Sequence, residues 1–112
     1  MARYILNSAV ITSPGEYSYR LISVDEARGW LAREEGYIST IGYEQTSAAL
    51  ERLTGHRVPV NRVTIEMQPG DEALVFRLKF PPGTPRIDPQ DKGKLEEHLL
   101  AGHYELGLLR KL

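Results

Sequence analysis

Polar side chains stand at two places in this sequence where a fold would not by itself require them. Asn7 and Ser8 directly follow a short apolar segment, at the kind of strand end where α/β proteins usually bind ligands. The segment from Ser39 to Thr46 places hydroxyls, an amide and a glycine at the predicted start of a helix. Backbone N–H groups at a helix start attract anions, so this segment predicts a phosphate-binding site. The alternative is ordinary capping of the helix by Ser39, Thr40 or a nearby residue.

Two basic residues, Arg77 and Lys79, alternate along a predicted strand and therefore share one of its faces. There they would be placed to meet a bound phosphate. The alternative is a solvated edge or an ion pair with Glu66 or Asp71. Because the formal net charge is −1, the chain lacks the strongly basic surface that binding of duplex nucleic acid requires. A bound anion must therefore be met by a local pocket.

The spacing of the histidines and the absence of cysteine argue against the common catalytic and metal-binding motifs. His56, His98 and His103 show neither HExxH nor HxH spacing, and we interpret them as structural or solvated. Without cysteine the sequence contains no disulfide, thiolate metal ligand or cysteine nucleophile, which fits a reducing compartment such as the cytoplasm. We therefore expect a site that uses neither a metal nor a cofactor.

The length of 112 residues predicts a single domain over residues 1–112. With 41% hydrophobic residues, such a chain can bury a core without metal or disulfide support. Its apolar runs are only a few residues long, far below the roughly 20 residues that span a bilayer. The N-terminal segment is too polar for a signal peptide, and we expect no membrane partner.

Hydrophobic periodicity and turn residues predict an α/β fold with a mixed sheet flanked by about three helices. The predicted strands are Tyr4–Leu6, Tyr17–Leu21 (a strand or an extended loop), Val63–Met67, Ala73–Phe80 and Tyr104–Leu109. The predicted helices are Val24–Glu35, Tyr43–Thr54 and Asp91–Ala101. Ser23 and Glu26 have the spacing of a capping box at the first helix, and Gly36 marks its predicted end. The proline-rich loop Pro81–Asp88 is either a lid or merely rigid.

Five segments of the chain, taken in order, resemble one protein family. They are YILNSAVI, ISVDEARGWL, STIGYEQTSAALERLTGHRVPVNR, IEMQPGDEALVFRLKF and the closing YELGLLRKL. On these segments the chain resembles the viral ring nuclease family, small anti-CRISPR proteins of archaeal viruses and phages with relatives on bacterial mobile elements. The resemblance covers nearly the whole chain and is interrupted only around residues 81–94.

The resemblance implies a homodimer whose interface forms one pocket for cyclic tetra-adenylate, the second messenger of type III CRISPR defence. In the family a ribose 2′-OH attacks the adjacent phosphate without a metal and leaves a 2′,3′-cyclic phosphate, while a histidine protonates the departing 5′-oxygen. The positions that match the family pattern are Asn7, Glu44, Thr46 and Asn61. The predicted ligand-binding residues are Asn7, Ser8, Glu44, Thr46, Arg77 and Lys79.

The sequence departs from the family pattern at two places. Tyr43 stands where the family has its catalytic histidine, in the pattern Ile-Gly-His-Glu. A tyrosine is protonated at neutral pH and can donate a proton, but it is a weaker acid than imidazolium. The family also carries an Arg and a Glu after its long strand, where this chain reads Phe80–Gly83. Arg77, Lys79 or Arg86 is the candidate replacement for the positive charge.

Three interpretations remain open on the sequence. In the first, the protein is a slow phosphodiesterase with Tyr43 as the proton donor, or with His56 recruited to that role. In the second, it binds a cyclic nucleotide and sequesters it, which requires affinity without transition-state stabilisation. In the third, it is a structural or regulatory dimer without a ligand. For a viral protein, the expected location is the host cytoplasm.

Overall fold

Strands β1 (Arg3–Leu6) and β4 (Glu72–Leu78) form the centre of the sheet because their side chains are largely apolar on both faces. Every residue of β1 is buried, and so is the run Ala73–Phe76 of β4. Such continuous apolar runs are typical of strands that are covered on both sides. The computed structural model describes residues 1–85 and 91–112 of the chain.

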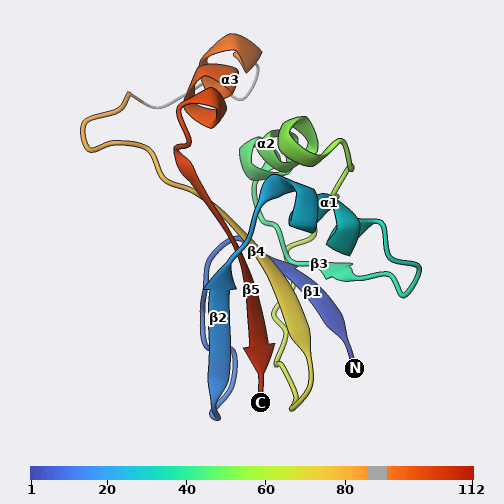
Figure 1. Cartoon of the computed structure of the whole chain (residues 1–112). Coiled ribbons are helices and arrows are strands. Elements are labelled where there is room, and N and C mark those ends of the chain that lie inside the picture. Colours follow the sequence, from blue (N-terminus) through green and yellow to red (C-terminus); the bar gives the residue numbers. More distant parts are fainter. Residues whose placement is uncertain (86–90) are drawn as a thin grey trace.

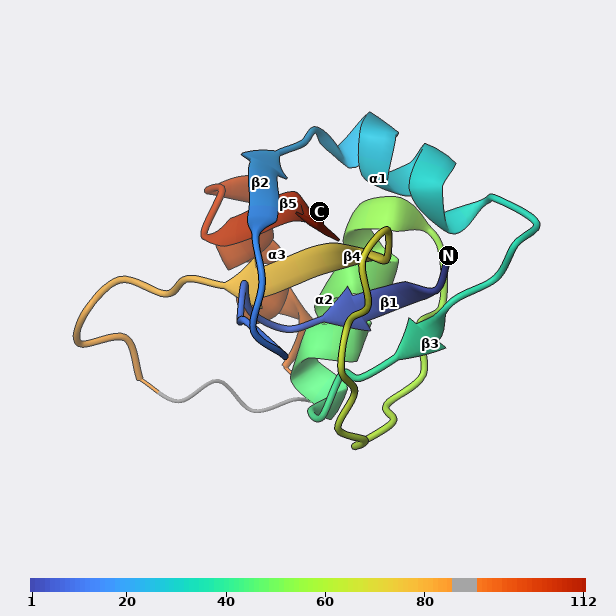
Figure 2. The ribbon, with the colours of Figure 1, turned by 90° about the horizontal axis from the view of Figure 1, so that it is seen from below.

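The strands of the described residues form one mixed sheet in the order β2-β5-β4-β1-β3 (Figure 1; Figure 2). β1 pairs in parallel with β4 and with the short strand β3 (Ile38–Ser39). β5 (Tyr104–Lys111) pairs antiparallel with β4 and with the edge strand β2 (Tyr17–Leu21). This sheet and the three helices of the described residues confirm the predicted single α/β domain.

Helices α1 (Val24–Leu31), α2 (Glu44–Thr54) and α3 (Lys92–Leu100) cover one face of the sheet. They gather toward the end of the sheet where the parallel strands finish (Figure 1). The core on this side includes Ile5, Leu74, Phe76 and Leu106 from the sheet and Ala27, Trp30, Leu31, Ala49, Leu50, Leu95 and Leu99 from the helices. Within the described residues, none of these helices is both long and apolar enough to cross a bilayer.

The opposite face of the sheet is covered by irregular chain. The residues buried there are Tyr4, Leu6, Met67, Ala73, Val75 and Leu109. The predicted strand Val63–Met67 lies on this face, and the prediction is wrong. Ile65 and Met67 do point inward, but the Met67 N–H donates to the hydroxyl of Thr12 at 2.9 Å instead of joining the sheet. A segment that lies over an apolar face alternates in burial whether or not a neighbouring strand pairs with it.

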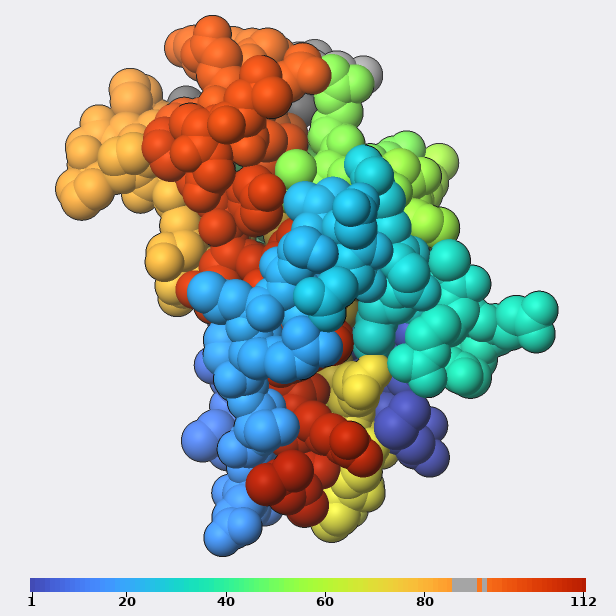
Figure 3. All heavy atoms as spheres, viewed as in Figure 1, coloured from blue at the N-terminus to red at the C-terminus, as the bar shows by residue number. Residues whose placement is uncertain are grey.

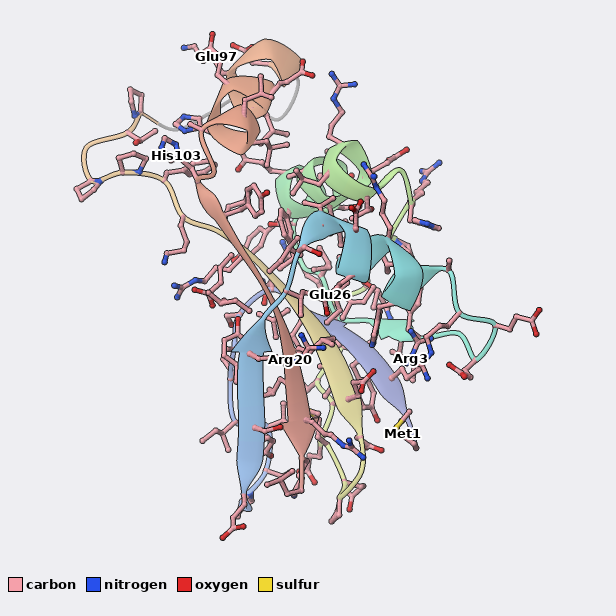
Figure 4. All side chains as sticks on the ribbon, in the orientation of Figure 1. Met1, Arg3, Arg20, Glu26, Glu97 and His103 are labelled. Carbon is pink, nitrogen blue, oxygen red and sulfur yellow. The ribbon has the colours of Figure 1, made fainter. Side chains whose placement is uncertain are left out.

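The helix starts follow the sequence closely. At α1, Ser23 Oγ accepts the N–H of Glu26 at 3.1 Å, as a capping residue does. The Glu26 carboxylate lies 3.0 Å from Arg20 (Figure 4), so the reciprocal half of the predicted capping box is replaced by an ion pair. At α2 and α3 the capping residues are Tyr43 and Asp91, the first residues of the predicted helices.

Arg3 explains why α1 stops at Leu31 and not at the predicted Glu35. Its side chain is almost wholly buried, and its guanidinium lies 3.9 Å from the centre of the Trp30 ring. It donates hydrogen bonds to the carbonyls of Trp30 and Gly36, so a side chain from β1 satisfies the last turn of α1 in place of further helix. Burial lowers the pKa of Arg3 from its ordinary value. The end of α1 is therefore set by a tertiary contact.

Replacing Arg3 by methionine should lower the free energy of unfolding by about 2 to 4 kcal/mol, because two carbonyls lose their donor. Urea denaturation followed by circular dichroism measures this change. The matched control is Arg33→Met, which removes two ion pairs of an exposed side chain, with Glu35 and Glu72, and should cost less than about 1 kcal/mol. Equal losses of unfolding free energy in the two variants would contradict the role of Arg3 in capping α1.

Candidate functional site

A hollow of about 390 Å³ opens where β1 ends. Among the described residues, the polar side chains that line it are Asn7, Thr12, Thr40 and Thr64. The apolar lining residues are Leu6, Val10, Ile11, Val63 and Ile65. An amide and hydroxyls set in an apolar wall are typical of small-molecule sites, in which a few polar groups orient the ligand.

The parallel pairing of β1 and β3 brings Asn7 and Thr40 together. Each is the first residue beyond its strand, and parallel strands finish at the same end of a sheet. The backbone N–H and the hydroxyl of Thr40 both donate to the carbonyl of Ile5, at 2.9 and 2.8 Å. Asn7, the first residue of the predicted site, therefore lies in the wall of the hollow beside Thr40.

The chain beyond Thr40 enters α2 without a side-chain cap. Thr40 donates its hydroxyl to Ile5, and Ser39 donates its own to the carbonyl of Pro59 at 2.6 Å. Capping by Ser39, Thr40 or a nearby residue, one of the two interpretations of the sequence, is therefore wrong, since no side chain among the described residues caps α2. The capping residue is Tyr43, whose side chain makes no capping hydrogen bond. Among the described residues, the first N–H groups of α2 thus have no side-chain partner.

Tyr43 stands at this helix start beside a positive charge. Its side chain is 61% exposed, and the guanidinium carbon of Arg62 lies 5.3 Å from the centre of its ring. Arg62 is held there by a 2.7 Å hydrogen bond from its Nε to the carbonyl of Gly42. In the first turn of the helix, Glu44 is exposed and Thr46 is buried. The predicted catalytic side chain is therefore exposed and lies next to a cation.

Two amide side chains near this turn differ in how they are used. The side-chain nitrogen of Gln45 is buried and has no hydrogen-bond partner among the described residues, which is uncommon for a buried polar group. Asn61, which matches the family pattern, donates its side-chain amide to the carbonyl of Ser39 at 2.9 Å and its N–H to that of Ile41 at 2.8 Å. Asn61 therefore holds the segment that leads into α2.

Arg77 lies in β4, which ends at Leu78 and not at the predicted Phe80, and Lys79 is the first residue beyond the strand. The partner of both side chains is Glu105 of β5. The Arg77 Nη2 and the Lys79 Nζ each lie 3.6 Å from Glu105 Oε1. In the antiparallel register Arg77 faces Glu105 directly. Pairing with Glu66 or Asp71 was the alternative interpretation and is wrong, since the Asp71 carboxylate accepts two backbone N–H groups at 2.8 Å instead.

Tyr19 of β2 completes this charged cluster. Its hydroxyl donates to Glu105 Oε2 at 2.7 Å, and its ring covers Gly107, where any Cβ would collide. Partial burial raises the pKa of Tyr19 to about 12, and the hydrogen bond to Glu105 contributes to this shift. The same hydrogen bond lowers the pKa of Glu105, as do Arg77 and Lys79. The two cations remain about half exposed, so each can meet a second anion.

The predicted binding residues come to one end of the sheet without being enclosed in one hollow. Asn7 alone among them lines the hollow. Tyr43 lies at the start of α2, and Arg77 lies two residues beyond the Leu6–Val75 pair of the parallel strands. One subunit therefore presents three separate polar groups at this end, and not a closed pocket.

The proline-rich segment after β4 is described only in part. Residues Pro81–Pro85 project from the body of the molecule (Figure 3). Arg86, a candidate replacement cation, and the rest of the predicted lid through Asp88 lie outside the described residues. The lid interpretation therefore remains a prediction.

Sequence reasoning missed Thr12, Thr64 and Arg62 as residues of this region. All three belong to irregular segments, where no periodicity relates a position to the direction of its side chain. The available signal was weak: hydroxyls at Thr12 and Ser13 follow the predicted strand end within a few residues.

Two of the three histidines pack against each other where α3 leads into β5. His98 and His103 lie with their Nδ1 atoms 2.7 Å apart between α3 and β5, and the Phe80 ring lies 4.7 Å from that of His98. In the described part of the chain, no three His, Asp or Glu side chains are arranged to hold a metal ion.

An α/β domain with polar groups at the ends of its parallel strands belongs to a class that commonly binds small ligands there. The chain belongs to the STIV B116-like family, which matches residues 3–88. It is 40% identical over 74 residues to the uncharacterized protein YddF of Bacillus subtilis (strain 168), covering 65% of this chain and 68% of YddF.

Two viral proteins are also similar to this chain. Identity is 36% over 80 residues with the uncharacterized protein 26 of a Sulfolobus islandicus filamentous virus, covering 68% of this chain and 67% of that protein. It is 31% over 80 residues with the uncharacterized protein ORF117 of Acidianus two-tailed virus, covering 68% of each. The solved structure of B116 of Sulfolobus turreted icosahedral virus matches with a TM-score of 0.76, covering 98% of this chain and 99% of B116. Their identity is 16%, so what this match establishes is the shared fold.

The lowered pKa of Glu105 gives a prediction for the pH dependence of stability. Glu105 stabilises the fold at pH values above the ordinary carboxyl pKa of about 4.3, and this contribution is lost as the pH falls through its lowered pKa. Glu105→Gln should therefore cost on the order of 1 kcal/mol at neutral pH and progressively less in acid. Urea denaturation across a pH series measures the difference. The exposed Glu34→Gln should show little effect at any pH, and a pH-independent cost for Glu105→Gln would contradict this assignment.

Proposed function

We propose that this protein binds cyclic oligoadenylate, with cyclic tetra-adenylate as the preferred ring, in a pocket between two copies of the chain. We further propose that it cleaves the ring without a metal to 2′,3′-cyclic-phosphate products and so counteracts type III CRISPR signalling in the host cytoplasm. The resemblance of five sequence segments to the viral ring nucleases supports this function. Membership in a family with members in Sulfolobus and Acidianus viruses is consistent with it.

The observation that carries the proposal is the uncapped start of α2. Its first N–H groups point away from the helix without a side-chain partner among the described residues, and they carry the positive end of the helix dipole. Tyr43 occupies the capping position, with the Arg62 guanidinium beside its ring. Amide donors, a cation and a phenol at one helix start suit a phosphate group.

A second copy of the chain supplies what one subunit lacks. A ring with four phosphates has two-fold symmetry, so two identical subunits can each present the same polar groups to half of it. The hollow beside Asn7 has apolar residues on its rim, and Val10, Ile11 and Val63 are all exposed there. Burying such side chains favours association. A dimer formed on this end would bring two helix starts and two hollows toward one ligand.

The chemistry asked of these groups is positioning, charge stabilisation and one proton transfer. The 2′-oxygen forms a bond to phosphorus as the bond from phosphorus to the 5′-oxygen breaks, and the 2′-OH proton passes to water. Helix N–H groups and the side chains of Arg77 and Lys79 would stabilise the charge that develops on the phosphate oxygens. Tyr43 would donate its proton to the departing 5′-oxygen and regain one from solvent. Asn7, Ser8, Glu44 and Thr46 would hold the ring in the in-line geometry.

Sequestration without cleavage is the second candidate function. It is favoured by one observation, the replacement of the family's histidine by Tyr43. General acid catalysis contributes roughly 10² to 10⁴-fold and is greatest when the pKa of the acid lies near the working pH. A binding protein requires the same amide donors and cations but no proton donor.

Incubation with cyclic tri-, tetra- and hexa-adenylate tests the function directly. We expect retention of cyclic tetra-adenylate on the protein and slow appearance of linear products with 2′,3′-cyclic phosphate ends, both read by chromatography. Asn7→Ala and Thr46→Ala should each weaken binding about tenfold, the loss of one or two hydrogen bonds. Ser18→Ala, on the remote edge strand, serves as the control. No retention of any ring would overturn the proposal, whereas retention without products would establish sequestration.

Substitutions of Tyr43 distinguish binding of the ring from its cleavage. Tyr43→Phe should remove turnover and leave ring affinity within about threefold, because only the proton donor is lost. Tyr43→His should raise the single-turnover rate by about tenfold or more, since imidazolium is the stronger acid. The control is Tyr104→Phe, which should keep the wild-type ring affinity and the wild-type turnover. Unchanged turnover in Tyr43→Phe would assign the proton donor to another group.

A further inference from the structure

We infer that Lys111 is a positioning residue that holds two walls of the hollow beside Asn7 in place. The first wall is formed by residues 10–12 and the second by residues 63–65. The importance of Lys111 for ligand binding rests on the function proposed above. Its contacts with the two walls do not depend on that function. Lys111 is the last residue of β5, next to the C-terminus of the described chain (Figure 1). It lies at the opposite end of the sheet from the strand ends that build the hollow.

The ammonium group of Lys111 contacts two separate segments. Its side chain is buried, and its Nζ donates to Ser13 Oγ at 2.8 Å and to the carbonyl of Met67 at 3.2 Å. Ser13 directly follows Thr12, a residue of the first wall. Met67 comes two residues after Ile65, the end of the second wall. One charged group therefore anchors both walls at their far ends.

Further hydrogen bonds join the two segments around this ammonium. Ser13 Oγ donates to the carbonyl of Met67 at 2.7 Å, and Met67 N–H donates to Thr12 Oγ1 at 2.9 Å. The hydroxyl of Tyr17 donates to the carbonyl of Ser13 at 2.6 Å, and its ring lies 5.9 Å from Lys111 Nζ. Neither segment has regular structure, so this network supplies the order that a strand or helix would otherwise provide.

The charge of Lys111 is not explained by packing. Among the described residues, no carboxylate oxygen lies within ion-pair distance of its Nζ, and its recorded partners are neutral oxygens. Burying an unpaired ammonium is costly, and a methionine would fill nearly the same space without that cost. What the ammonium adds is donors that reach two segments at once.

The turn at Gly15 is shaped around the stem of Lys111. A Cβ at Gly15 would lie 2.7 Å from Lys111 Cε, and its φ of +146° strains any other residue. The positive φ favours glycine at this position, and a Cβ there would also displace the end of the Lys111 side chain. Gly15→Ala disturbs the same anchor from outside without removing the charge.

Hydrogen exchange of the ligand-free protein tests this inference, comparing wild type with Lys111→Met, Lys111→Arg, Gly15→Ala and the exposed control Lys94→Met. In Lys111→Met and Gly15→Ala, amides of residues 8–16 and 63–70 should exchange about tenfold faster, while amides of β4 keep their wild-type rates. Lys111→Arg should restore most of the protection, and Lys94→Met should match wild type. Equal acceleration in β4 would reveal a merely structural role and overturn the inference. Unchanged protection of the two walls would overturn it as well.

Binding of cyclic tetra-adenylate to the same variants separates this inference from the proposed function. We expect affinity to fall at least fivefold in Lys111→Met and Gly15→Ala and to recover in Lys111→Arg. If the wild type binds no ring while the walls loosen as described, the proposed function fails and the positioning role stands. If the wild type binds and the walls loosen but affinity is unchanged, the walls do not position the ligand and the inference fails.

Discussion

Parallel pairing of β1 with a neighbour on each side decides where the rest of this protein can lie. Because β3 and β4 both run with β1, the chain leaves all three strands at one end of the sheet. Asn7, Thr40 and Arg77 reach that end from three distant segments. Parallel strands also need crossover connections, and these place α1 and α2 on one face. The same strand order therefore determines the position of the start of α2, which carries Tyr43, and of the hollow beside Asn7.

Much of the fold could be predicted because its boundaries are local. Gly55 takes a φ of +74° and ends α2 where glycine alone does so without strain, and Ser23 caps α1 by itself. The predictions failed where a distant residue decides. α1 ends early because Arg3 reaches from β1 to the carbonyl of Trp30 in its last turn and to that of Gly36 beyond it. β3 has too few residues to show any period. Val63–Met67 alternates because it covers a sheet face, which is a tertiary cause for a pattern that looks local.

The residues of the candidate site divide in the same way, into those that local sequence can place and those that depend on tertiary contacts. Asn7, Tyr43 and Thr46 could be placed from the sequence, since each is tied to the end of a predicted element. The Glu105 partner of Arg77 could not, because it depends on the register between β4 and β5. The other lining residues of the hollow come from irregular segments whose direction only the folded chain defines.

The sheet face without helices gives this family a way to diversify. Irregular segments tolerate substitution and length change better than the elements beneath them, and here they form walls over a sheet whose core lies mostly on the other side. B116 shares the fold at 16% identity, so most side chains of this scaffold can differ while its architecture is kept. Surface chemistry and architecture are therefore separable properties of this scaffold. The irregular layer can therefore change in sequence and length while the helical layer stays as it is.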